Sequence, residues 1–437
     1  MIALTTFPTL ARLTVFCAAA GLTAAAPLSG AVPQNAAAGT RGGPALAILA
    51  AKALVASPEG EQVIDWAVVI IRDGKIERVA PRSEVDLTGG DYEVLDVGES
   101  WIMPGMIDLH SHVGGTRRDI NDMVYQTNPG LSVAPTVIPA NPGLRLPLAA
   151  GITTILYIPG SGTNMGGQGV LMKTGAKRYE QALVRDPGSL KIAQGDNPTR
   201  WGYGMGRLLM NYHLRTTISQ GLRYAHAWLA FEAGTGEKPE RDIRLDIFRP
   251  LQARETQVST HTQYYQLVMM SILMLSRDYG FDTFIDHGSF DSYENSELAE
   301  RYNVAAILGP REVMWPSPPR YDTDGQAHGS AWGFQQRGHP RIGFNTDAPV
   351  VPQEELPLQA AMGVRYGMDN SHMDAVRGVT IIPALTAGIA HRVGSLEPGK
   401  DADLVVVSGD PIDPRSGVEA VLIEGRLVYD AKQGRRW

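Results

Sequence analysis

The chain has 437 residues, of which 43% are hydrophobic and 19% are charged, and its formal net charge is −7. This composition can bury a large core, which excludes a wholly disordered chain and fibrous architectures. The mildly acidic balance shows no electrostatic footprint for nucleic acid, so we expect no nucleic-acid partner. The single cysteine, Cys17, lies in an apolar N-terminal stretch. It therefore excludes a disulfide framework and a cysteine-based zinc site further along the chain.

Residues 1–31 are predicted to be a signal peptide. One charged residue, Arg12, precedes an apolar run over residues 13–26 that is long enough for a signal-peptide core and too short to span a bilayer. Residues 32–44 are rich in alanine, glycine and proline and are typical of a linker. We therefore expect a periplasmic or secreted protein whose mature chain is not held in a membrane. A disordered alanine-rich leader, or a start codon assigned too early, is the alternative interpretation.

Both flanks of the remaining chain, residues 45–103 and residues 392–437, are predicted to be rich in β-strands. Each contains a turn dipeptide between two short apolar runs, Asp73–Gly74 in the first flank and Glu424–Gly425 in the second. This pattern predicts a β-hairpin at each position.

Between the flanks, residues 104–391 alternate between apolar strand candidates and helical stretches such as 264–278. The strand candidates are residues 106–109, 153–158, 170–172, 190–193, 257–260, 283–286, 304–308 and 341–345. Eight strands in about 250 residues are typical of a (β/α)8 barrel, so we predict an α/β fold of the TIM-barrel type. A doubly wound open sheet is the alternative. The glycine-rich segment 159–169 has the spacing of neither a dinucleotide-binding motif nor a P-loop, and it is predicted to be a long loop at the barrel mouth.

Polar residues end several of the predicted strands. They are His110 and His112 after the first strand, His261 after the fifth, His287 after the sixth and Asp347 after the eighth. Alternation along a strand places His110 and His112 on one face, and the carboxyl ends of barrel strands share one mouth. Neutral imidazoles and a carboxylate at one mouth suit Zn²⁺ or a similar divalent metal. Taken singly, each histidine could be a hydrogen-bonded structural residue and Asp347 a helix N-cap. The joint pattern favours a metal site.

A metal at this mouth would lower the pKa of its water and polarise a scissile carbonyl. Asp347 would then act as the general base, and we regard Asp347 and His287 as candidate catalytic residues. No G-x-S-x-G elbow and no H-E-x-x-H motif occurs in the sequence, which argues against a serine hydrolase and a zincin.

Six segments of the chain resemble those of a known protein family. The segments that carry the resemblance are Pro104–His112, Gly151–Thr154, 159–168, Lys191–Pro198, Asn345–Asp347 and Leu396–Leu404. They resemble the metal-dependent amidohydrolase superfamily and, within it, the imidazolonepropionase-like branch. The resemblance implies a (β/α)8 barrel, a small β-sandwich formed by the two flanks, and hydrolysis of an amide or cyclic amide bond. It also implies one metal at His110, His112 and Asp347, with His261 and His287 serving a second metal or the substrate.

Two residues near the fourth strand compete to supply a further anionic group. Lys191 resembles the lysine that many relatives carboxylate to bridge two metals, and only as a carbamate could it ligate one. Asp196 needs no modification and follows in Gly-Asp-Asn-Pro, where close relatives carry the longer glutamate. We favour Lys191 as the bridge, with Asp196 contacting metal or substrate. A charge paired inside the barrel and a turn residue are the respective alternatives.

The substrate is predicted only as a class, a dipeptide, an N-acyl amino acid or a similar small amide. Aromatic residues in the segment 199–255 could line an apolar pocket, although helix packing explains them as well. They are Trp201, Tyr203, Tyr212, Tyr224 and Trp228. A binding protein that kept the barrel without turnover is the competing function class, and the sequence leaves a homo-oligomer open.

Overall fold

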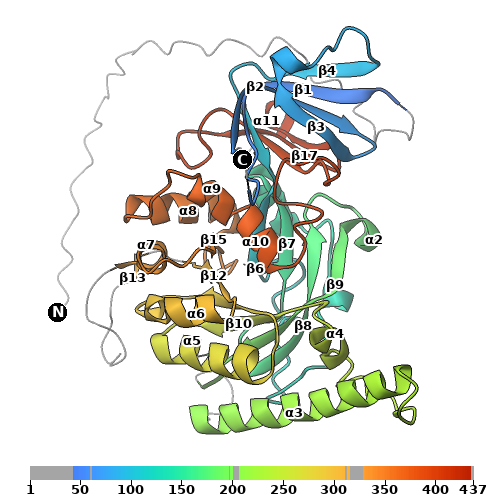
Figure 1. Ribbon diagram of the computed structural model, residues 1–437, viewed down its shortest axis with the longest axis vertical. Helices are drawn as coiled ribbons and strands as arrows, with labels where there is room; N and C mark the ends of the chain where they lie inside the picture. Colours follow the sequence, from blue (N-terminus) through green and yellow to red (C-terminus); the bar gives the residue numbers. More distant parts are fainter. Residues whose placement is uncertain are drawn as a thin grey trace, which may run out of the picture.

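The computed structural model of the chain describes residues 43–59, 62–195, 197–199, 206–310, 313–314 and 328–434. The predicted signal peptide and most of the predicted linker lie outside the described residues, as do Asp196, Trp201 and Tyr203. Two eight-stranded sheets organise the chain, one built by the flanks and one by the central segment (Figure 1). Among the described helices, none combines the length and the hydrophobicity that a membrane span requires.

The two flanks join in a single sheet. Its strands are β1 (Ala45–Leu54), β2 (Val63–Arg72), β3 (Lys75–Pro81), β4 (Tyr92–Asp96), β5 (Trp101–Pro104), β16 (Leu404–Val407), β17 (Val418–Ile423) and β18 (Arg426–Asp430). The order is β18-β17-β16-β5-β1-β2-β3, with β4 also paired to β1. Antiparallel pairing of β16 with β5 joins the C-terminal flank to the N-terminal one. The predicted hairpins at Asp73–Gly74 and Glu424–Gly425 connect β2 to β3 and β17 to β18. The β-sandwich implied for the two flanks, in which this sheet would divide into two packed layers, stays a prediction.

The central sheet also has eight strands. They are β6 (Met106–Ser111), β7 (Ile152–Tyr157), β8 (Met165–Lys173), β9 (Leu183–Ala193), β10 (Val258–Thr262), β11 (Thr283–His287), β12 (Ala305–Leu308) and β15 (Ile342–Phe344). They follow the order β15-β12-β11-β10-β9-β8-β7-β6. The two ends approach each other at a bridge between Ser111 and Ala348, where the backbone N–H of His112 donates to the Ala348 carbonyl at 2.8 Å. The sheet is therefore a nearly closed barrel.

One strand departs from the regular (β/α)8 pattern that the sequence predicts. β8 pairs antiparallel with both β7 and β9, whereas the other neighbouring strands of the barrel run parallel. Parallel strands need a crossover of about a dozen residues or more, and residues 158–164 between β7 and β8 are too few for one. The barrel is TIM-like, but β7, β8 and β9 form an antiparallel meander.

The glycine-rich segment is only partly a loop. Residues 165–169 belong to β8, so the prediction of a loop over 159–169 was wrong in its second half. Gly167 has a φ of +118°, and a Cβ there would lie 2.6 Å from the Leu131 carbonyl oxygen. The glycines thus allow another backbone segment to approach the strand closely.

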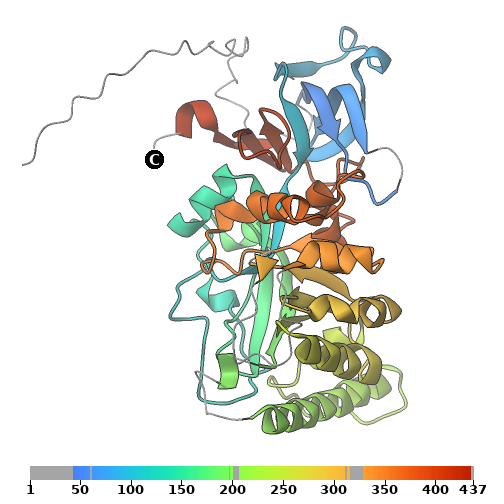
Figure 2. The same ribbon diagram turned by 90° about the vertical axis from the view of Figure 1, so that its left-hand side faces the viewer.

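Most of the helices lie beside the barrel, and the last one follows β18 in the flank sheet (Figures 1 and 2). They are α1 (Arg145–Ala149), α2 (Tyr179–Ala182), α3 (Arg207–Glu232), α4 (Phe248–Gln252), α5 (Tyr265–Ser271), α6 (Ser296–Arg301), α7 (Ser330–Gln336), α8 (Leu356–Arg365), α9 (Asp374–Gly378), α10 (Ile381–Thr386) and α11 (Ala431–Gly434). α5 continues as a π-helix over Ile272–Asp278, which accounts for the predicted helical stretch 264–278. A two-stranded ribbon pairs β13 (Val313–Met314) with β14 (His328–Gly329).

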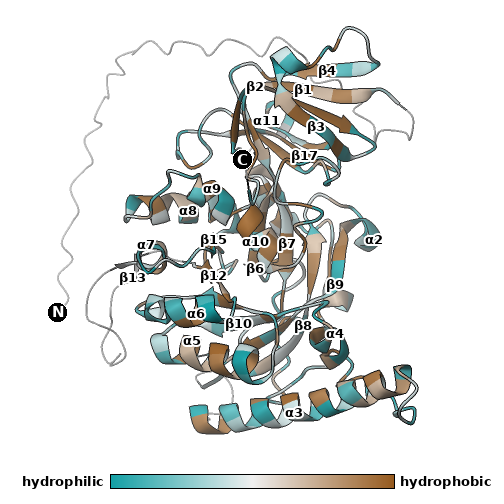
Figure 3. Cartoon of the chain, in the orientation of Figure 1, coloured by the Kyte–Doolittle hydropathy of each residue, from teal (hydrophilic) through white to brown (hydrophobic). Residues whose placement is uncertain are grey.

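Apolar residues concentrate on the strands of both sheets, and polar residues on the outer helix faces (Figure 3). β6, β10 and β11 are buried along their whole length. Strands that are buried on both faces are typical of barrels covered by helices. Polar side chains at the ends of these strands are therefore held in a rigid, dry setting.

Candidate metal centre

β6 places His110 at the barrel mouth, and His112 lies directly after the end of this strand. Both imidazoles are buried, and their Nε2 atoms lie 3.1 Å apart, as alternation along one strand predicts. The buried carboxylate of Asp108 supports the strand end by accepting hydrogen bonds from the His110 backbone N–H at 3.0 Å and from Thr346 Oγ1 at 2.5 Å. Burial raises the pKa of Asp108 to about 6 against these hydrogen bonds.

Asp347 brings a carboxylate to the same point from the segment after β15. Its Oδ1 lies 3.1 Å from His110 Nε2 and 3.3 Å from His112 Nε2. Its backbone has a φ of +48°, in the left-handed region, which asparagine and aspartate tolerate better than most residues. Burial by itself would raise the pKa of Asp347, but the charge and hydrogen bonds of His110 and His112 hold it well below its usual range.

The protonation of these groups shows what the centre can hold. His112 Nδ1 lies 2.9 Å from the Ile158 carbonyl oxygen and must carry the hydrogen, so its Nε2 presents a lone pair. His110 Nδ1 lies 2.7 Å from Asp286 Oδ2 and carries a hydrogen in the same way. Burial by itself would lower the pKa of His110, but Asp286 and Asp347 raise it to about 9, so its Nε2 also holds a proton, which a metal would displace. Once the Nε2 proton of His110 is displaced, two lone pairs and a carboxylate oxygen face one another. Ligands of a four-coordinate zinc site are about 3.3 Å apart when each is about 2.0 Å from the ion, so the observed separations fit a metal.

A second group of donors adjoins the first. His261 and His287 end β10 and β11, and His287 Nε2 lies 2.7 Å from His261 Nδ1. His287 Nδ1 donates to the Gly309 carbonyl at 3.0 Å, so His261 Nδ1 must donate to His287 Nε2. His261 Nε2 is then a buried acceptor with no hydrogen-bond partner among the described residues. Burial lowers the pKa of both histidines, that of His287 to about 4, which keeps them neutral as metal ligands require.

Lys191 on β9 lies between the two groups. It is fully buried, with Nζ 3.3 Å from His110 Nε2 and 3.4 Å from Asp286 Oδ2. Burial lowers the pKa of its amine, against the opposing effect of Asp286 and Asp347. Lys191 thus faces the centre, while its competitor Asp196 lies outside the described residues.

The structure brings together His110, His112, Lys191, His261, His287 and Asp347, which the sequence singled out from four strand ends and one strand interior. Sequence reasoning missed Asp286. Alternation directs Asp286 away from the side to which His287 points. Asp286 is the register partner of His261 and points to the same side of the sheet, and the φ of +83° at His287 turns that residue so that both side chains reach the centre. His110, Asp286 and His287 form a second set of donor atoms close enough to share an ion.

Comparison with known proteins agrees with this geometry. Residues 335–434, which include Asp347 and the strands β16–β18, match the amidohydrolase family. The chain is 25% identical over 400 residues to an imidazolonepropionase of Chromobacterium violaceum, covering 85% of this chain and 92% of that protein. It is 24% identical over 389 residues to the amidohydrolase tasK of Hapsidospora irregularis, covering 82% of this chain but 39% of that longer protein.

A solved structure shows the same overall likeness. The amidohydrolase of Thermotoga maritima superposes with a TM-score of 0.78 at 26% identity, covering 88% of this chain and 100% of that one. The barrel, the convergence of histidines and aspartate, and these relatives agree with one another. The chain is therefore similar to metal-dependent amidohydrolases, and among them to imidazolonepropionases, and these findings support a hydrolase that acts on carbon–nitrogen bonds.

Proposed function

We propose that the protein is a periplasmic or secreted zinc hydrolase of small amides, such as dipeptides, N-acyl amino acids or cyclic amides. The observation that carries the proposal is the triangle of His110 Nε2, His112 Nε2 and Asp347 Oδ1, whose members lie 3.1 to 3.3 Å apart. These residues would hold the metal. When bound, a divalent metal supplies a water of lowered pKa and polarises the scissile carbonyl.

The side chains around the triangle have separate roles in this proposal. Asp347 takes the proton of the attacking water on its carboxylate and passes it to the leaving nitrogen. Ser161 Oγ lies 3.0 Å from His261 Nδ1 and fixes the imidazole ring in place. Burial of the surrounding strand ends excludes bulk water and strengthens each of these interactions.

Metal analysis with a substrate screen tests the proposal. The purified protein should contain one or two equivalents of zinc, and His110→Ala should lose both metal and activity. Hydrolysis is screened on dipeptides and N-acyl amino acids, with free amine detected. Full activity after exhaustive chelation would falsify the metal mechanism. A metal-replete protein that turns over no amide in the screen would favour the binding protein instead.

We further propose that Lys191 bridges two metals as a carbamate. Its Nζ attacks the carbon of CO₂, forms an N–C bond and releases one proton, which converts the amine into an anionic ligand. Its complete burial beside His110 supports this role. Lys191→Ala should bind one metal and recover the second when short-chain carboxylic acids are added. Retention of both metals in Lys191→Ala, with loss of one in Asp196→Ala, would assign the role to Asp196.

Export is a separate proposal that rests on the N-terminal sequence. Cleavage before about residue 40, after Ala31 in our prediction, should give a shortened N-terminus in periplasmic material. N-terminal sequencing of the exported protein measures it directly. An intact Met1 on folded, active enzyme would contradict it.

A further inference from the structure

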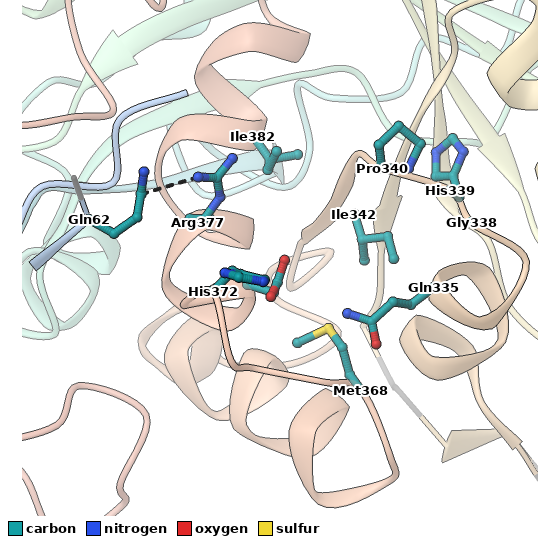
Figure 4. A pocket seen from close by; sticks show the side chains of 11 residues that line it. Gln62, Gln335, Gly338, His339, Pro340, Ile342, Met368, His372, Arg377 and Ile382 are labelled. Atoms are coloured by element: carbon teal, nitrogen blue, oxygen red, sulfur yellow. Dashed lines mark hydrogen bonds between the residues drawn. The ribbon is translucent and has the colours of Figure 1, made fainter. Parts of the chain in front are cut away.

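A cavity of about 490 Å³ lies at the end of the barrel opposite the metal centre (Figure 4). Ile342, the first residue of β15, lines it, whereas Asp347 follows the other end of the same strand. The rest of the lining comes from the end of α7 and the segment before β15, from the segment between α8 and α9, from α9 and α10, and from Gln62 in the N-terminal flank. Its volume is within the range of small-molecule sites, about 300–1,000 Å³.

The floor of the cavity is apolar. Ile342, Met368 and Ile382 line it and are only 8%, 3% and 5% exposed. In Figure 4 the side chains of Met368 and Ile342 approach the same space as the Gln335 amide. This floor suits an aliphatic group of the size of a leucine or methionine side chain.

One wall of the cavity carries two opposite charges that do not pair with each other. Asp374 and Arg377 both line it and lie three residues apart on α9, so they share a helix face. No ion pair of Arg377 or of Asp374 occurs among the described residues, and the Asp374 carboxylate also has no hydrogen bond there. Arg377 Nη1 donates to the Ser57 carbonyl at 2.9 Å and to Gln62 Oε1 at 3.1 Å. These bonds fix the guanidinium and leave Nη2 and Nε for an anion.

We propose that this cavity binds a free α-amino acid with an aliphatic side chain. The carboxylate of the ligand pairs with Arg377, its ammonium with Asp374, and its side chain contacts Ile342, Met368 and Ile382. Neighbouring groups on one helix face are about 5–6 Å apart at Cβ, a spacing that the two charged groups of an amino acid can bridge. A ligand with one charge would leave the opposite wall charge without a partner. The site does not depend on which amide the barrel hydrolyses.

Calorimetric titration of the full-length protein with L-leucine tests the site. We expect one molecule to bind, with equal affinity in the metal-containing protein, the chelator-treated protein and His110→Ala, because the cavity lies away from the metal centre. Binding that disappears in both metal-free forms would place leucine in the metal centre and overturn the proposal. An absence of binding up to roughly 10 mM leucine, about ten times a millimolar dissociation constant, would overturn it as well.

Two analogues of leucine and two variants of the protein then distinguish the contributions of the two charges to binding. 4-Methylpentanoate lacks the ammonium and 3-methylbutylamine lacks the carboxylate, and neither contains an amide bond. Each should bind about tenfold more weakly than leucine or worse, since a charge-assisted hydrogen bond is lost. Asp374→Asn should weaken leucine binding by a similar factor and leave the affinity for 4-methylpentanoate unchanged.

Arg377→Met should weaken leucine and leave the affinity for 3-methylbutylamine unchanged. Because Arg377→Met also loses the bonds to Ser57 and Gln62, thermal unfolding checks its fold. Asp374→Asn breaks no contact of the described structure. If Arg377→Met is unstable, the measurements on Asp374→Asn are sufficient to test the proposal. Arg365→Met, which removes an exposed charge on α8 outside the cavity, is the matched control and should bind leucine as the unaltered protein does. Leucine affinity unchanged in Asp374→Asn would overturn the proposal.

Discussion

Asp286 contacts two of the side chains that face the metal centre, through a carboxylate oxygen 2.7 Å from His110 Nδ1 and 3.4 Å from Lys191 Nζ. A carboxylate on the far nitrogen of a ligating histidine fixes its tautomer and increases its basicity. Asp286 thus acts through His110 and positions it. This role depends on one carboxylate oxygen, and the pattern of apolar and polar residues along the strand does not predict it.

We predict that Asp286→Asn lowers the affinity for zinc by about 10- to 100-fold, because the amide cannot supply the same negative charge to His110. Competition with a zinc-binding dye measures the affinity, and circular dichroism checks the fold. Asp282→Asn, which alters a surface carboxylate 3.1 Å from Arg254, is the matched control. Equal zinc affinities in the two variants would contradict the positioning role.

For Asp347 we predict a loss in kcat of about 100-fold or more in Asp347→Asn, the scale expected when a general base is removed. Asparagine keeps the size of the side chain but cannot accept the proton. Metal content is measured on the same preparation, so that a loss of chemistry is distinguished from a loss of metal. Undiminished kcat in folded, metal-replete Asp347→Asn would assign the proton transfer to another group.

At the scale of elements, apolar runs located all eight barrel strands, and the strand ends located His110, His112, His261, His287 and Asp347. The apolar pattern did not predict that β8 runs antiparallel to its neighbours, although the short connection 158–164 between β7 and β8 indicates it. Asp286 was missed because the strand pattern assigned the inward position at the end of β11 to His287, whereas Asp286 is the register partner of His261 and His287 turns inward through a positive φ that depends on tertiary contacts. Apolar patterns therefore predict where strands lie, and connection lengths are needed to predict how they run.

The antiparallel meander depends on close contact between β8 and β9. A Cβ on Gly188 of β9 would lie 2.6 Å from the Leu171 backbone nitrogen and 2.8 Å from the Val170 carbonyl carbon of β8. We predict that Gly188→Ala lowers the free energy of unfolding by about 1–3 kcal/mol, the usual cost of overpacking. Denaturant unfolding measures it. Gly89→Ala, where the nearest atom would be 3.9 Å away, should change the stability little, and an equal loss in both variants would refute the contact argument.

At the scale of the whole molecule, a buried cluster of charges joins the barrel to the flank sheet. Lys173, at the end of β8, lies 2.7 Å from Asp401, 3.2 Å from Asp403 and 3.0 Å from Glu424. Asp401 also pairs with Lys75 of β3 at 2.5 Å and with Arg392 at 2.9 Å. The segment Leu396–Leu404, which marked the family resemblance in the sequence, thus supplies the two aspartates that connect the two sheets.

The position of Asp401 among three cations predicts how stability depends on pH. Burial by itself would raise its pKa, but Lys173, Lys75 and Arg392 outweigh burial and lower the pKa to about 2. A folded-state pKa below the unfolded value of about 3.9 stabilises the fold above that value, and the contribution is lost as pH falls toward 2. A shift of this size corresponds to about 2 kcal/mol. Asp403 opposes it, since burial raises its pKa.

The contribution of Asp401 is therefore measured in a variant that leaves Asp403 unchanged. We predict that Asp401→Asn is less stable than the unaltered protein near neutral pH, and that the difference shrinks by about 2 kcal/mol between pH 5 and pH 2. Urea unfolding at a series of pH values measures it. Asp65→Asn alters a surface carboxylate that is 70% exposed and 4.0 Å from Lys52, and it should show a small, nearly constant difference. A difference for Asp401→Asn that stays constant across this range would mean that its carboxylate charge does not join the two sheets.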